Sequence, residues 1–265
     1  MLSNYAFLTS TYIPSFTELV CFPDPLPRAL SFTNFEATSK PTQMIYLLRS
    51  EMMDREIVPA GGHFYEFLKR TFDIVSSFCF LLLFGWIILL LLFIKFCEDG
   101  RNPIYTSKRV GKNGKIFKFH KIRSMRPDAE KLKQQLIAEG KNEATYPVFK
   151  MKNDPRITKF GRFIRKHNLD ELPQIYDVLV GRLSIIGPRS PLIEEAKTYS
   201  SYERHRLDVK GGLLCYWQIQ PKRNKVSFDE WVDLDIQYVE TRSVKTDMKI
   251  LFKGIFSCIK KMDGE

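Results

Sequence analysis

The feature that most constrains the fold of this chain is an uncharged run of 21 residues, Ile74–Ile94. As an α-helix the run would be about 30 Å long, which matches the hydrocarbon core of a bilayer. A buried helix of a soluble protein rarely lacks charge over such a length, so we expect the run to lie in a membrane. It begins roughly 70 residues into the chain, which is not the pattern of a signal peptide. Basic residues flank both ends and leave the orientation open: Lys69, Arg70, Lys95 and Arg101.

Composition divides the chain around this run. Residues 1–62 contain six prolines and show no steady periodicity, so we expect an extension with little core, whose role the sequence does not tell. Three methionines there leave a later start of translation open: Met44, Met52 and Met53. We expect residues 63–100 to form a membrane-inserted helical segment and residues 101–265 to form a cytosolic domain.

The basic charge belongs to the later part of the chain. The net charge is +11, and residues 73–265 carry 35 basic and 23 acidic side chains. This excess predicts an anionic partner. We do not expect nucleic acid, because no nucleic-acid-binding module accompanies the charge. The five cysteines are scattered and include no Cys-x-x-Cys pair, so a disulfide framework or a zinc site is not expected.

Local patterns after the apolar run predict an α+β domain that is mostly helical. Alternating residues in 104–110 and 115–122 flank a Gly-rich turn and predict a β-hairpin. Pro127-Asp128 opens a predicted helix that runs through Glu139. Asp154–Lys166 and Val244–Ile259 have apolar stripes at helical spacing with basic residues around them. Each of these two amphipathic helices would lie either in the lipid interface or on the protein core.

Two adjacent carboxylates, Asp170 and Glu171, follow the basic Asp154–Lys166 helix. Lys121 and Arg123 on the hairpin and Arg189 in a Gly-Pro-Arg turn would supply cations nearby. We expect such cations to lower the pKa of a neighbouring carboxyl and to keep it ionised. An ionised carboxylate could attack phosphorus or bind a divalent cation. The alternative is a solvated first turn of a helix, where acids are favourable.

Several segments occur in the order seen in one known family. The central ones are Lys108–Gly111, Lys121–Met125, Asp154–Thr158, Leu169–Gln174 and Ile186–Arg189. Others precede or follow them: Phe67–Asp73, Tyr216–Gln218, Leu234–Val239 and Asp247–Leu251. From about Tyr65 to Ile259, the chain resembles the bacterial sugar transferase family, whose members are monotopic polyprenyl-phosphate phosphoglycosyl transferases.

The resemblance implies a reaction. Such enzymes transfer a sugar 1-phosphate from a UDP-sugar to a polyprenyl phosphate, usually undecaprenyl phosphate, and release UMP, which initiates exopolysaccharide, O-antigen or glycan assembly. It implies that residues 101–265 are the catalytic domain and that Asp170 is the nucleophile, which forms a covalent phosphosugar-aspartyl intermediate. Glu171 would assist the second half-reaction, or would hold Mg²⁺ together with Asp170. The expected phosphate-binding set is Lys121, Arg123, Arg156, Arg165 and Arg189.

The resemblance also implies a location at the bacterial inner membrane, with the catalytic domain facing the cytoplasm and contacting membrane lipid. The family breaks its membrane helix at a Ser-Pro pair to make it re-entrant. The resemblance implies a re-entrant helix here as well, but this chain has Phe84-Gly85 at that place, which leaves a full span open. Other differences lie at Arg182, Ser190 and Leu214, and they leave a second hypothesis open: a non-catalytic, membrane-bound scaffold of a glycan assembly complex. The sequence indicates neither the sugar nor whether the chain forms a homodimer.

Overall fold

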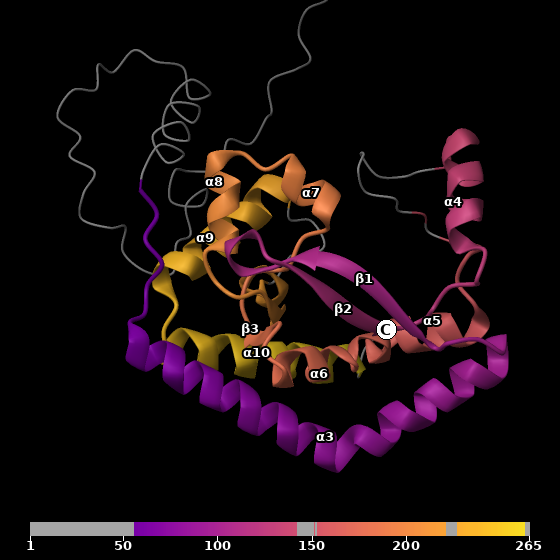
Figure 1. The fold of residues 1–265 in the computed structure, drawn as a ribbon, viewed down its shortest axis with the longest axis horizontal. Coiled ribbons are helices and arrows are strands. Elements are labelled where there is room, and N and C mark those ends of the chain that lie inside the picture. Colours follow the sequence, from indigo (N-terminus) through magenta and orange to yellow (C-terminus); the bar gives the residue numbers. More distant parts are fainter. Residues whose placement is uncertain (1–55, 142–150, 152, 221–226, 263–265) are drawn as a thin grey trace, which may run out of the picture. The chain divides into compact units, whose positions relative to one another are not determined.

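The computed structural model describes residues 56–141, 151, 153–220 and 227–262, with side chains as far as 256. It is a mixed helical and β structure in which helices predominate (Figure 1). The α-helices are α3 (His63–Asp99), α4 (Ala129–Ala138), α5 (Lys159–Lys166), α6 (Gln174–Leu179), α7 (Ile193–Lys197), α8 (Ser201–Arg204), α9 (Phe228–Thr241) and α10 (Val244–Met262). The strands are β1 (Ile104–Val110), β2 (Ile116–Ile122), β3 (Ser184–Ile186) and β4 (Gly212–Leu214). Short 3₁₀ turns are η1 (Lys112–Gly114), η2 (Leu169–Glu171), η3 (His205–Leu207) and η4 (Tyr216–Ile219).

The predicted extension lies outside the described residues up to position 55, and this includes Met44, Met52 and Met53. Its last residues, 56–62, pack on the rest of the chain. Ile57 is buried in the main core, and the Ala60 backbone N–H donates to the Val239 carbonyl at 2.9 Å.

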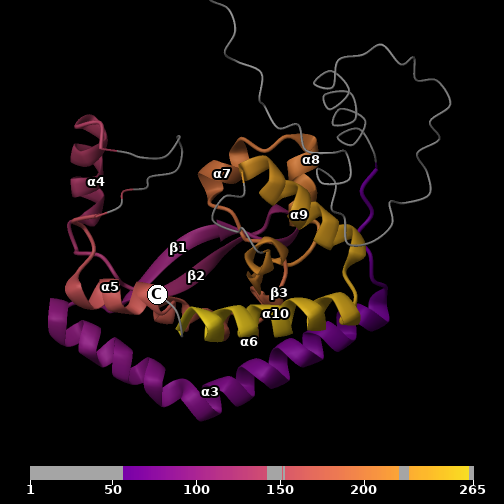
Figure 2. The ribbon, with the colours of Figure 1, turned by 180° about the vertical axis from the view of Figure 1, so that it is seen from behind.

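Helix α3 contains the whole apolar run. Among the described residues it is the one helix that is long and apolar enough to cross a membrane, and 17% of its most apolar 18-residue window is buried. Figures 1 and 2 show it from opposite sides, and in both views it is bent near its middle. It ends at Gly100, whose φ of 63° is in the left-handed region that favours glycine. The exposed apolar surface indicates association with a membrane.

The N-terminal end of α3 is fastened to the domain by polar contacts. Arg70 donates through Nη1 and Nη2 to two backbone carbonyls at the end of α6, at 2.8 and 2.7 Å. Asp73 accepts hydrogen bonds from Ser184 Oγ at 3.1 Å and from the Ile185 backbone N–H at 2.9 Å. These contacts hold α3 against α6 and β3.

The C-terminal end of α3 is fastened to the same domain. The fully buried Lys95 Nζ lies 2.7 Å from Glu98, 2.8 Å from Asp99 and 3.2 Å from Thr158 Oγ1. Glu98 in turn accepts from Thr158 Oγ1 at 3.0 Å and from the Phe160 backbone N–H at 3.3 Å. Both ends of the apolar helix therefore contact one folded unit.

The predicted hairpin is confirmed. β1 and β2 pair antiparallel from Ile104↔Ile122 to Val110↔Ile116. The Gly-rich turn is η1, in which Asn113 has a φ of 55°. Because side chains alternate across a strand, Lys121 of β2 and Arg109 of β1 share one face of the hairpin.

A second sheet of two short parallel strands, β3 and β4, was not predicted. Ser184 pairs with Gly212, and Ile186 pairs with Leu214. The strands approach so closely that a Cβ on Gly212 would lie 2.1 Å from the backbone nitrogen of Gly187, which only a glycine permits. This contact fixes the turn that carries Arg189.

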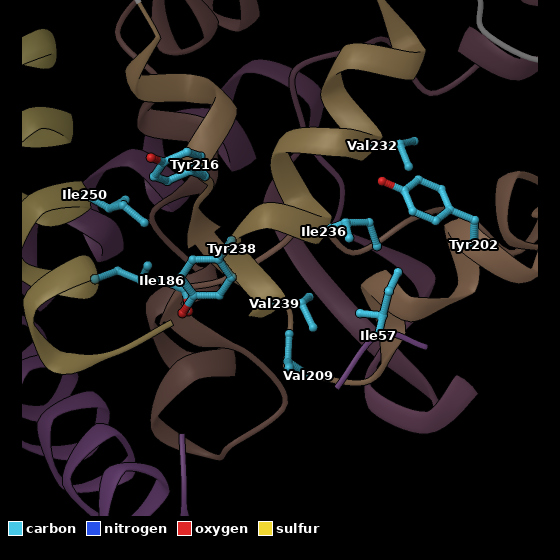
Figure 3. Close-up of a cluster of buried hydrophobic side chains, with 10 residues drawn as sticks. All are labelled: Ile57, Ile186, Tyr202, Val209, Tyr216, Val232, Ile236, Tyr238, Val239 and Ile250. Carbon is cyan, nitrogen blue, oxygen red and sulfur yellow. The ribbon is translucent and has the colours of Figure 1, made fainter. Parts of the chain in front are cut away.

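The main core lies between α9, α10 and the β3–β4 sheet (Figure 3). Its buried residues are Ile57, Ile186, Tyr202, Val209, Tyr216, Val232, Ile236, Tyr238, Val239 and Ile250. A second cluster joins α3, β2 and α5 through Leu91, Ile122 and Ile164. The two clusters hold the hairpin and the β3–β4 sheet on the same side of α3.

The predicted amphipathic helices both pack partly on the protein. The prediction that the first begins at Asp154 was wrong, because α5 begins at Lys159 and Thr158 Oγ1 caps it by accepting from the Gly161 N–H. Its Ile164 is fully buried. On α10, Ile250 is buried, whereas exposed aromatic and aliphatic side chains cover another face: Phe252, Ile255 and Phe256.

Candidate active site

The two adjacent carboxylates lie on η2, between α5 and α6. Asn168 precedes them with a φ of 55°, which turns the chain sharply after α5. Asp170 is 7% exposed, while the Glu171 side chain is 44% exposed. The turn therefore points one acid into the protein and leaves the other at the surface.

Strand β2 supplies the cation of this site. Lys121 Nζ lies 2.5 Å from Glu171 Oε1. The neighbouring residue His120 binds the fully buried Asp177 of α6 twice, through its backbone N–H at 3.0 Å and through Nδ1 at 2.8 Å. Asp177 also accepts from Arg182 at 2.9 Å, so Arg182 has a structural contact here. This network fixes Lys121 relative to η2.

The pKa of Asp170 differs from the sequence prediction. Cations were expected to lower it, but burial raises the pKa of this carboxyl above its usual value. Lys121 and Arg165 lower it and Glu171 raises it, and neither cation outweighs the loss of hydration. The prediction was wrong because the sequence shows which charged residues are near Asp170 but not how deeply the fold buries it. A buried carboxylate with a raised pKa is typical of functional sites.

The structure brings some of the predicted phosphate-binding residues near the pair and assigns other contacts to the rest. Lys121 and the exposed Arg165 both influence Asp170. Arg156 forms a buried two-point contact with Asp154, through Nε at 2.9 Å and Nη2 at 2.6 Å. The half-buried Arg123 is held by its backbone N–H, which donates to the carbonyl of residue 103 at 2.7 Å. The proposed contacts of Arg123 and Arg156 with phosphate remain predictions.

Arg189 and a residue that sequence reasoning missed form a second cationic group. The Arg189 guanidinium lies 5.0 Å from the centre of the Trp231 ring. Arg109 of β1 donates to the Ser190 carbonyl at 3.0 Å and lies 5.1 Å from the centre of the Phe119 ring. Burial, and then repulsion from Arg189, lower the pKa of Arg109. The alternation of the hairpin could have revealed Arg109, because it shares a face with Lys121.

Comparison with protein families matches the sequence that forms this site to one family. The model for bacterial sugar transferases matches residues 64–261, which includes α3, the hairpin and η2. The chain belongs to the bacterial sugar transferase family. The resemblance of the sequence motifs is thereby confirmed.

Three relatives illustrate the range of the sugar transferases. Galactosyl transferase CpsE of Streptococcus agalactiae is 43% identical over 199 residues, which is 74% of this chain and 44% of the relative. Undecaprenyl-phosphate galactose phosphotransferase of Salmonella typhimurium is 41% identical over 190 residues, 71% of this chain and 40% of the relative. Exopolysaccharide production protein ExoY of Rhizobium meliloti is 36% identical over 199 residues, 74% of this chain and 86% of the relative. The chain thus spans less than half the length of the first two relatives.

The donor atoms of this sugar transferase site fit a magnesium ion that also binds substrate. Mg²⁺ is commonly held by one or two carboxylates together with substrate phosphates. Among the described residues, no other side chain hydrogen-bonds to Asp170, and Glu171 presents a second carboxylate. The described residues contain no group of three or more acidic, His or Cys side chains that could hold a metal unaided. Water and substrate phosphate oxygens would therefore complete such a site.

Proposed function

We propose that this sugar transferase moves a sugar 1-phosphate from a UDP-sugar to a polyprenyl phosphate, such as undecaprenyl phosphate, and releases UMP. Family membership supports the reaction class. So do the names of relatives, among them the UDP-glucose:undecaprenyl-phosphate glucose-1-phosphate transferase of Escherichia coli, 33% identical over 199 residues. The observation that carries the proposal is the buried Asp170 carboxylate beside Lys121 and Arg165.

In the first half-reaction, an Asp170 oxygen attacks the phosphorus that bears the sugar. A new carboxyl–phosphorus bond forms, the bond from that phosphorus to the bridging oxygen of the diphosphate breaks, and UMP leaves with the electron pair. Lys121 and Arg165 offset the charge that develops on the phosphate oxygens. Burial favours this attack because a poorly hydrated carboxylate is a stronger nucleophile. Bound Mg²⁺ would supply further charge neutralisation at the diphosphate, held by Asp170 and Glu171.

In the second half-reaction, a phosphate oxygen of the lipid attacks the same phosphorus. The carboxyl–phosphorus bond breaks, Asp170 is regenerated, and the sugar remains on a lipid diphosphate. Glu171 lies at the surface in contact with Lys121. This contact supports a role for Glu171 in orienting the lysine toward the incoming lipid phosphate. The two halves balance as one UDP-sugar and one lipid phosphate giving one lipid diphosphate sugar and one UMP.

The lipid acceptor requires the site to face a membrane, and the two fastened ends of α3 support a re-entrant arrangement. A helix held to one domain at Asp73 and again at Glu98 cannot place these ends on opposite sides of a bilayer. We propose that both ends lie at the cytoplasmic face of the inner membrane. The native cysteines are first replaced throughout the chain: Cys21, Cys79, Cys97, Cys215 and Cys258. In that background, a cysteine placed at His63 and, separately, one placed at Arg101 should react with an impermeant thiol reagent from the same side of sealed vesicles. Labelling from opposite sides would contradict re-entry.

The reaction is tested by UMP release from the purified full chain with Mg²⁺, undecaprenyl phosphate and a panel of UDP-sugars that includes UDP-galactose and UDP-glucose. Without the lipid at most one UMP per enzyme should form, from the first half-reaction, and continued UMP release should require the lipid. Asp170→Asn should abolish both. Asp128→Asn is the matched control, since it makes the same chemical change at an exposed aspartate of the chain. Turnover that survives Asp170→Asn would overturn the assigned nucleophile. Wild-type protein that turns over no UDP-sugar would favour the scaffold hypothesis.

A further inference from the structure

An open, charged pocket lies away from the carboxylate pair, against the N-terminal half of α3. Its open volume is about 300 Å³, and it is bordered by α3, the start of β3, the chain just before β4, and the end of α9. Four cationic side chains line it: Lys69, Arg70, Lys210 and Arg242. Two acidic side chains line it as well: Glu66 and Asp73. None of the residues proposed above for sugar phosphate transfer lies in this lining.

Two of the four cations are neutralised inside the protein. Lys69 Nζ lies 2.7 Å from the Asp247 carboxylate, and Arg242 Nη1 lies 2.6 Å from Glu66. The paired side chains of Lys69, Asp247 and Arg242 are largely buried, at 9%, 11% and 6% exposure. The opposite charges in these two pairs compensate each other, so neither cation needs an anionic ligand.

The other two cations are not neutralised. Arg70 donates its two described hydrogen bonds to backbone carbonyls, which carry no net charge. The ammonium of half-buried Lys210 has no hydrogen bond or ion pair with any described residue. The pKa of Lys210 is lowered, first by burial and then by Arg70, so these two cations repel each other across the pocket. Asp73 offsets part of this charge, but it is already bonded to Ser184 and Ile185.

Lys210 is also held in a fixed place. Its backbone carbonyl would lie only 2.4 Å from a Cβ on Gly187, so the segment before β4 packs tightly on the turn after β3. Arg70 and Asp73 stand immediately before Ile74, where the apolar run begins. With the apolar run in a membrane, as proposed above, the pocket would lie where α3 leaves the hydrocarbon, at the level of the lipid headgroups and of solutes at the membrane surface.

We propose that this pocket binds a phosphate group, with Arg70 and Lys210 as its cationic partners. A phosphate monoester or diester has the oxygens to accept from a guanidinium and an ammonium together, and its charge would relieve their repulsion. The phosphate comes either from a phospholipid headgroup or from free phosphate at the membrane surface. The inference is independent of the proposed transferase reaction, since it uses other residues.

The test measures binding and stability together on the full chain in a detergent without phosphate. Inorganic phosphate and short-chain phosphatidylglycerol are each titrated by calorimetry, in the presence of excess UDP-sugar to occupy the carboxylate site. Each probe that binds should raise the midpoint of thermal unfolding in proportion to the logarithm of the probe's concentration. Binding of both, or of one, supports the proposal, and the comparison identifies the source of the phosphate.

Lys210→Met distinguishes a ligand site from a structural contact. This variant should bind at least about tenfold more weakly, because it loses a charged hydrogen bond. Without phosphate its unfolding midpoint should be unchanged or higher, because the repulsion from Arg70 is removed. Lys210→Arg should retain binding, and so should Lys118→Met, which removes the same charge from an exposed strand position. Either of two results would overturn the proposal: no binding of either probe in the presence of UDP-sugar, or full binding by Lys210→Met.

Discussion

The contacts of Lys95 lead to a quantitative prediction about how α3 is held. Lys95 is 0% exposed, and its ammonium contacts Glu98, Asp99 and Thr158. Substitution by Met keeps a side chain of similar length and so preserves most of the packing. It removes the charge, and it leaves the Asp99 side chain, which is 8% exposed, without its cation.

Removing one partner of a buried ion pair generally costs about 3–5 kcal/mol, because the remaining charge stays buried. The Glu98 side chain is 27% exposed, so water can partly replace the lysine there. The lower end, about 3 kcal/mol, is therefore expected for Lys95→Met. For a folded unit of this size such a loss lowers the midpoint of thermal unfolding by about 6–12 °C.

The assay is thermal unfolding of the detergent-solubilised full chain, with hydrogen exchange measured for the amides of α5. Lys95→Met should show the lower midpoint and faster exchange in α5, because Thr158, which caps α5, loses a partner. Adding Asp99→Asn should recover part of the loss, because no buried charge is then left alone. Lys115→Met, at an exposed position, is the control. A midpoint equal to that of the control, or no recovery in the double variant, would refute the reasoning.

Four further predictions concern the site and the sheet that supports it. Because the folded pKa of Asp170 is raised, its ionised form costs stability, so Asp170→Asn should raise the unfolding midpoint while abolishing turnover. For the same reason, kcat/KM of the wild type should rise with pH as Asp170 ionises, with an apparent pKa above the usual aspartate value of about 3.9. An apparent pKa at or below that value in the pH profile would contradict the burial argument. Lys121→Met should lower kcat/KM by about 10–150-fold, because one charged hydrogen bond is lost. Lys118→Met, on the other face of β2, should leave kcat/KM unchanged. Gly212→Ala should destabilise the chain by about 1–3 kcal/mol, since its Cβ would clash with the Gly187 nitrogen, and an unchanged midpoint in chemical denaturation would be inconsistent with the strand contact.

The sequence was sufficient where a local pattern decides the structure. The hairpin follows from alternation on both sides of a Gly-rich turn, and α10 follows from a long apolar stripe. The β3–β4 sheet could not be predicted in this way. Its strands are three residues each, too short to show a period, and the paired residues Ser184 and Gly212 are far apart in the chain.

The chemistry of the carboxylate pair shows a second limit of sequence reasoning. Two of the expected bases, Lys121 and Arg165, influence the pKa of Asp170, yet the direction of that pKa was predicted wrongly, because the fold buries this acid while leaving Glu171 half exposed. Arg156 illustrates the reverse case. It is a basic residue at an expected position, but its guanidinium contacts Asp154, two residues away. Which charges remain available to a substrate depends on contacts that appear only when the chain has folded.

The same distinction applies to the path of α3 through the membrane. The apolar run by itself is compatible with a full span and with re-entry, and Gly85 is a weaker helix breaker than proline. A Cβ at Gly85 would meet no atom within 4 Å, so packing against other parts of the protein does not require glycine there. What favours re-entry is the pair of polar attachments, Asp73 at one end and Glu98 at the other. Moving the first end across the bilayer would leave the buried Asp73 and Ser184 unpaired. Moving the second would break the hydrogen bonds of Glu98 to Thr158 and Phe160. The re-entrant topology proposed for this chain therefore rests on the residues that flank the apolar run rather than on the run itself.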